Sequence, residues 1–116
     1  MFTTLKLTSS LAIGSVISFD ASAQAWALAQ DSSQLIGVVS GEPFETEGAW
    51  YAQVTVGGAC LALASRDISA EGGGLMVENG GVYVGGLFAD RAGEVAPVAW
   101  DQPAPKAGDL VLIFLR

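Results

Sequence analysis

The chain has 116 residues, the length of one domain, and a formal net charge of −7 with only five Lys or Arg residues. These few basic residues are scattered, so the basic stripe that nucleic-acid binding requires is missing, and an anionic membrane would repel the chain. Charged residues make up 15% of the sequence, against about 25% in a typical soluble domain. So few charges predict apolar surface patches and association with other copies.

The first 25 residues superficially resemble a secretory signal, because Lys6 precedes an apolar stretch. Serines and Gly14 interrupt that stretch, and Val16 and Ile17 favour a strand, so we expect the segment to belong to the folded protein. The sequence predicts an N-terminal arm or edge strand over residues 1–14 and a single β-domain over residues 15–116. The arm is expected to add to the edge of a neighbouring sheet, which makes three of its residues candidate interface residues: Phe2, Leu5 and Leu7.

Strand signals recur at short intervals along the rest of the chain, and no window shows apolar residues at helical spacing. Between Trp50 and Val56 the pattern alternates cleanly, with Ala52, Val54 and Val56 on one face. Strands are expected at residues 15–20, 23–29, 35–40, 50–56, 59–64, 75–78, 82–84 and 110–115. The fold class is therefore all-β with little or no helix: a small β-sandwich or β-barrel (β-tulip-like) of about seven to nine short strands.

Turn chemistry supports this reading. Asn79-Gly80 between two apolar runs predicts a hairpin, because both residues tolerate positive φ. Gly37 inside an apolar strand indicates a bulge or a close backbone approach. The acidic segment Gly41–Gly48 and the segment Ala96–Lys106, which contains three prolines, are expected to be loops.

Four side chains are the candidate core: Trp26, Val54, Val56 and Leu112. Trp100 lies inside the proline-rich segment, where it cannot easily reach a central core. An aromatic side chain in that position suits an interface anchor, and a sugar-stacking platform is the alternative.

Groups that carry chemistry are scarce. The sequence has no His, which removes the commonest general base and most transition-metal sites, and Cys60 alone forms no disulfide framework. A Ser–Lys pair would need a buried lysine, and Lys106 lies at an expected turn. Glu45 and Glu47 would share a side of an extended segment, but a solvated loop explains them better than a Ca²⁺ site. The sequence therefore predicts no enzyme, no cofactor and no metal.

The order of these features resembles the small β-domains of tailed-phage heads and spikes. The resemblance covers about residues 15–84, and Gly108-Asp109-Leu110 fits the Gly-Asp turn common in that family. It is carried by short motifs: Ser15–Ile17, Ala25–Gln30, Leu35–Ser40, Trp50–Gly58, Ala59–Leu63 and Leu75–Val77.

The resemblance implies a capsid decoration (cement) protein on the outer capsid surface of a virion. Such a protein forms a homotrimer, binds the major capsid protein and stabilises the shell. The same module also builds head-fibre and tail-spike bases, which is the alternative within structural proteins. A carbohydrate-binding β-module is the alternative from another class.

Overall fold

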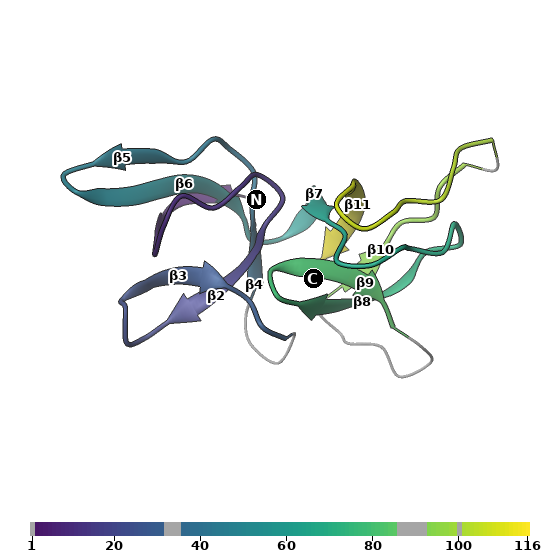
Figure 1. Ribbon diagram of the computed structural model, residues 1–116, viewed down its shortest axis with the longest axis horizontal. Coiled ribbons are helices and arrows are strands. Elements are labelled where there is room, and N and C mark those ends of the chain that lie inside the picture. The colour runs from purple at the N-terminus through teal and green to yellow at the C-terminus, as the bar shows by residue number, and fades with distance from the viewer. Residues whose placement is uncertain (1, 32–35, 86–92, 100) are drawn as a thin grey trace.

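A computed structural model describes residues 2–31, 36–85, 93–99 and 101–116, and these form eleven strands and no helix. They lie in an elongated molecule of 47 × 27 × 23 Å (Figure 1). In chain order the strands are β1 (Phe2–Leu7), β2 (Val16–Asp20), β3 (Ala25–Leu28), β4 (Ile36–Val39), β5 (Phe44–Thr46), β6 (Ala49–Thr55), β7 (Gly58–Leu63), β8 (Gly73–Glu78), β9 (Gly81–Val84), β10 (Gly93–Val95) and β11 (Leu110–Leu115).

The all-β prediction is confirmed, but the strand count exceeds the expected seven to nine. The additional strands are β1, β5 and β10. Strand β5 lies within the segment expected to be an acidic loop, where Phe44 pairs with Tyr51 of β6 and their rings stack with centroids 6.1 Å apart. This cross-strand aromatic pair favours a hairpin in spite of the neighbouring glutamates.

The first sheet closes into a five-stranded barrel in the order β1-β3-β2-β4-β6, because β1 also pairs with β6 (Figure 1). The β1–β6 pairing is antiparallel and runs the full length of β1, from Phe2 opposite Thr55 to Leu7 opposite Trp50. Leu7 also pairs with Trp26 of β3. Residues 2–7 are therefore a wall of the barrel and not a free arm or an edge strand.

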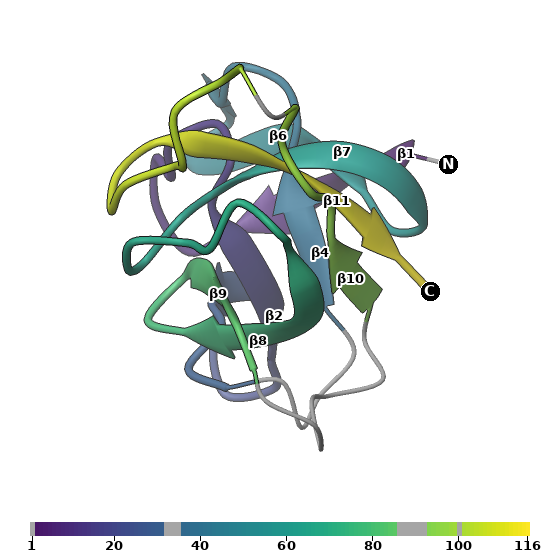
Figure 2. The same ribbon diagram turned by 90° about the vertical axis from the view of Figure 1, so that its right-hand side faces the viewer.

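The second sheet has the order β7-β11-β10-β8-β9. It curls until its ends approach, as Figure 2 shows, and an isolated bridge joins Ala64 to Val82. The β8–β9 hairpin turns at Asn79 and Gly80, which have φ values of 45° and 77°. This is the hairpin that the Asn-Gly signal predicted.

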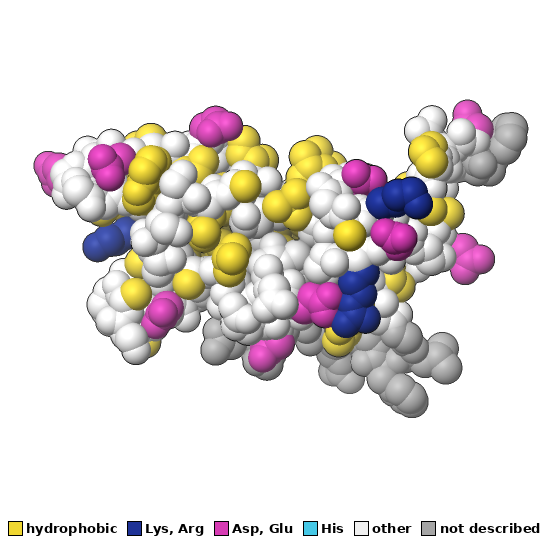
Figure 3. Space-filling view, viewed as in Figure 1, with side chains coloured by type: hydrophobic (Ala, Val, Ile, Leu, Met, Phe, Trp, Pro, Cys, Tyr) yellow, Lys and Arg dark blue, Asp and Glu magenta, His cyan; other side chains and the backbone are white. Residues whose placement is uncertain are grey.

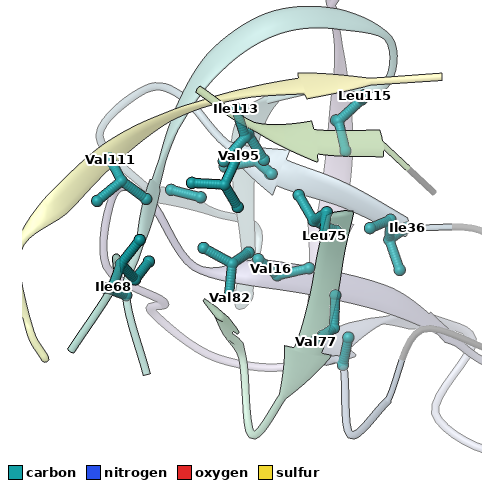
Figure 4. Packing of buried hydrophobic residues seen from close by; sticks show 14 residues of the cluster. Val16, Ile36, Ile68, Leu75, Val77, Val82, Val95, Val111, Ile113 and Leu115 are labelled. Atoms are coloured by element: carbon teal, nitrogen blue, oxygen red, sulfur yellow. The ribbon is translucent and has the colours of Figure 1, made fainter. Parts of the chain in front are cut away.

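Two clusters of buried side chains form the core. The cluster inside the first barrel is small and consists of Leu7, Ile17, Val39, Ala52 and Val54. The larger cluster fills the second sheet, and Figure 4 shows its side chains converging from strands of both sheets. Its members are Val16, Ala29, Ile36, Val38, Ala62, Ala64, Ile68, Leu75, Val77, Val82, Val95, Val111, Ile113 and Leu115.

Strands β2 and β4 form a wall common to both cores. Neighbouring residues of a strand point to opposite faces, so Val16 and Val38 enter the larger cluster while Ile17 and Val39 enter the smaller one. All four residues of β4 are buried for this reason. Gly37 is the close approach that the sequence indicated, because a Cβ there would lie 2.6 Å from Cγ1 of Val54.

Backbone hydrogen bonds tie the two sheets together at two glycines. Gly80 of the β8–β9 turn donates to Ala29 at 2.7 Å and accepts from Val16 at 2.8 Å. Gly14 donates to Val39 and accepts from Leu63, each at 2.8 Å. These bonds fix β7 and the β8–β9 hairpin against the first barrel.

The candidate core residues have different outcomes. Val54 is fully buried, as predicted. Trp26 and Val56 are half-buried and pack against the smaller cluster from its margin. The prediction that Leu112 is a core residue is wrong, because its side chain points away from the core of the second sheet and the residue is 44% exposed.

Candidate association surface

Strand β11 is apolar on both of its faces. Val111, Ile113 and Leu115 point inward and are buried. The alternate residues point outward and remain exposed in the chain: Leu110 at 48%, Leu112 at 44% and Phe114 at 45%. An apolar strand with one solvated face is unusual in an antiparallel sheet, where that face is commonly polar.

Strand β7 extends this apolar surface. Directly opposite residues of an antiparallel pair share a face, so Leu61 stands beside Leu112 and is 51% exposed. The outer surface has three such rows, which we name the β7–β11 outer face: Leu63 with Leu110, Leu61 with Leu112, and Ala59 with Phe114. Figure 2 places β7 and β11 together at one surface of the molecule, and Figure 3 shows hydrophobic side chains reaching the surface above β7.

None of the six residues of this face is charged, and an ion pair lies at one end of it. Glu94 of β10 pairs with Phe114 in the register and accepts a hydrogen bond of 3.0 Å from the Arg116 guanidinium. Both side chains are more than half exposed, so this ion pair adds little stability. Its consequence is that the end of the face carries no net charge.

The outer face of the first barrel differs. Thr4, Lys6 and Gln53 give it a polar character. Two exposed aromatic residues also belong to this barrel and its hairpin: Phe44 stacks on Tyr51, and Phe19 makes an edge contact with Trp26. Leu28 of β3 is 39% exposed as well, and the other described apolar residues of that barrel mostly point inward or lie at its margin.

Of the interface residues predicted from sequence, neither Leu5 nor Leu7 belongs to this surface. Leu7 is buried inside the first barrel, so the prediction that it contacts a partner is wrong. Leu5 is half-buried and packs against the same cluster. Phe2 is part of β1, while its side chain and the whole of Trp100 lie outside what the structure describes.

Reactive groups are not gathered anywhere in the described residues. No cluster of three or more His, Cys, Asp or Glu side chains with metal-binding geometry occurs among them. Burial raises the pKa of the Cys60 thiol to about 11, which leaves almost no thiolate at neutral pH. Arg66 forms two hydrogen bonds of 2.7 Å with Glu78 and covers the ring of Tyr83, so its charge is engaged in a surface contact.

A hollow of about 220 Å³ lies at one end of the first barrel. Trp50 and Thr8 line it, and Lys6 is the charged residue of its lining. Trp50 packs against the barrel core, so its ring is not a free stacking platform.

No protein-family model, curated protein or solved structure matches this chain. None of the described segments forms a helix that could cross a membrane.

Proposed function

We propose that this chain is a structural protein that acts by association: a capsid decoration protein that binds the outer surface of a viral head as a trimer and stabilises the shell. The observation that supports this function best is the β7–β11 outer face, where Leu61, Leu110, Leu112 and Phe114 are each about half exposed. Contiguous apolar surface of this kind is typical of association sites. The viral setting, the trimer and the major capsid protein as partner come from the resemblance of the sequence motifs.

The architecture suits a protein that clamps a shell. A clamp binds the assembled state and not the dissociated one, so it stabilises the assembly by mass action without any chemistry. It requires a scaffold that keeps its shape under load, and here two cores share β2 and β4 while backbone hydrogen bonds at Gly14 and Gly80 tie the sheets together.

A head-fibre or tail-spike base is the alternative that uses the same association surface, and copy number per particle separates it from a decoration protein. A carbohydrate-binding module has less support, because Trp26 and Trp50 pack against the first core. The exposed β7–β11 outer face supports both structural candidates, the decoration protein and the fibre or spike base.

The test uses heads of the encoding virus assembled without this protein. Adding the purified chain should saturate the heads at many copies each and raise the temperature at which they break. The bound copies are counted by quantitative mass spectrometry, and breakage is followed by release of the packaged DNA. Only a few copies, all located at the tail, would favour the spike base, and no binding to any part of the particle would overturn the proposal.

A further inference from the structure

We infer that the β7–β11 outer face packs against the same face of another copy of this chain. This inference rests on the proposed structural function, since it names the partner of the surface that supports it. A shell or any other foreign partner must then bind elsewhere on the molecule.

Charge favours a second copy on this face. Each chain carries a net charge of −7, so two copies repel each other over most of their surfaces. The β7–β11 outer face has no charge, and Glu94 and Arg116 at its rim compensate each other. A basic partner would instead be drawn to the acidic segment that leads into the β5–β6 hairpin and its turn, where Glu42, Glu45 and Glu47 are exposed.

Shape favours a second copy as well. The face is a two-stranded antiparallel surface with three regular rows, and Leu61 and Leu112 form the middle row. Sheet faces of this kind pack on one another about 10 Å apart with interlocking side chains. Two copies related by a two-fold axis would stack these faces, and three copies around a three-fold axis would enclose them at a common centre. In both arrangements Leu112 of one copy lies near Leu112 of its neighbour.

The area is sufficient for a specific contact. The exposed fractions of Leu61, Leu110, Leu112 and Phe114 correspond to roughly 350–400 Å² of apolar surface on each copy. Two such faces, together with Leu63, Ala59 and the rim, reach roughly 1,000 Å², the lower bound for a specific interface. An additional contact, such as a third copy, would strengthen it.

The first experiment compares Leu112→Lys with Phe44→Lys. The two wild-type side chains are similarly exposed, at 44% and 49%, but Phe44 lies on the β5–β6 hairpin away from the face. We expect the wild-type chain and Phe44→Lys to associate at micromolar concentration, and Leu112→Lys to associate roughly tenfold or more weakly. Light scattering coupled to size exclusion measures the mass, and circular dichroism checks that each variant keeps its strands.

The second experiment detects the contact directly by cross-linking, so it does not require a substitution that weakens the contact. In a Cys60→Ala background, Leu112→Cys places a thiol in the middle row and Gln53→Cys places one on the outer face of the first barrel. Under mild oxidation the Leu112→Cys chain should form a disulfide-linked dimer at low protein concentration, while the Gln53→Cys chain should not.

The outcomes separate this inference from the proposed function. If the chain associates but neither Leu112→Lys nor the cross-link responds, the copies meet through another face and the inference is wrong while the structural function stands. If the chain is monomeric and Leu112→Lys abolishes binding to heads, the face takes a foreign partner, and again only the inference fails. If the wild-type chain does not bind heads, the proposed function fails, and the cross-link alone decides whether copies meet here.

Discussion

The two halves of this molecule use apolar residues in different ways. The first barrel directs most of them inward around a small cluster and presents Thr4, Lys6 and Gln53 on its outer surface. Its exposed apolar side chains, those of Phe19, Leu28 and Phe44, come from three different strands. The second sheet fills a larger cluster and still has apolar residues left over, which stand on the outside of β7 and β11. On β7 and β11 the exposed apolar side chains lie in adjacent rows of two paired strands, and folding of the single chain buries only about half of each.

This difference shows that the hydrophobicity of a strand does not by itself tell which of its faces is buried. In β6 the alternation between Ala52 or Val54 and polar neighbours marks the inner face. In β11 both faces are apolar, so only the structure distinguishes the face that is buried from the face that remains exposed.

The most direct test of the two faces of β11 truncates two neighbouring residues of this strand, one that points inward and one that points outward. Ile113→Ala removes a fully buried side chain from the larger cluster and should cost about 2–5 kcal/mol of unfolding free energy. Leu112→Ala, one residue earlier, should change the free energy of unfolding of the monomer by only about 0.5 kcal/mol. Urea denaturation at low protein concentration measures both. Equal losses would show that β11 is buried on both faces within one chain.

The first barrel is tested by Leu7→Ala. Because Leu7 is buried where β1 pairs with both β3 and β6, we expect a loss of about 2–4 kcal/mol in unfolding free energy. The matched control is Thr3→Ala, an exposed residue of the same strand. If Leu7→Ala leaves the melting temperature unchanged while altering only association, then residues 2–7 form an arm after all.

A smaller effect is expected at Gly37, where the two cores meet. In Gly37→Ala the added methyl group lies 2.6 Å from Cγ1 of Val54, so the barrel must shift to admit it, at a cost of about 1–3 kcal/mol. Gly57→Ala is the control, since no atom lies within 4 Å of a Cβ placed there. Thermal melts followed by tryptophan fluorescence distinguish the two, and a neutral Gly37→Ala would contradict the tight contact between β4 and β6.

The smallest effect concerns the surface of the second sheet. Hydrogen bonds from Arg66 hold the pKa of Glu78 below its usual range, so its ionised form stabilises the fold above about pH 4.5 and this contribution is lost as pH falls through the lowered pKa. Glu78→Gln should therefore lower the melting temperature slightly at pH 7, with the difference from wild type shrinking toward pH 3. If the difference in melting temperature persists at pH 3, or does not change when salt is added at pH 7, the effect comes from packing and not from the ion pair.

The sequence was informative where local chemistry decides the structure. The Asn79-Gly80 turn, the alternation around Val54 and the close approach at Gly37 all follow from single residues or short patterns. The pairing of β1 with β6 could not be predicted, because it joins residues about fifty positions apart and depends on barrel closure. Closure is also why Leu7 is buried, although its position near the chain start suggested an arm.

The association surface was missed for a different reason. Residues 110–115 are all apolar, so no alternation indicates which of them point inward, and Leu112 was assigned to the core. A comparison of β7 with β11 would have given a hint, since Ala62 and Ala64 are small where Leu61 and Leu63 are large. Along this segment the buried Ala62 and Ala64 occupy the inner side, while Leu61 is 51% exposed on the outside.

The wall formed by β2 and β4 has a consequence for how the protein unfolds. A strand that contributes alternate side chains to two cores cannot leave one core without leaving the other, so neither half is an independent folding unit. Heating should therefore give a single calorimetric transition whose van't Hoff and calorimetric enthalpies agree, although the chain holds two sheets. Amide hydrogens of the four-residue strand β4 should exchange with solvent only when the whole molecule unfolds, so they should be among the slowest to exchange.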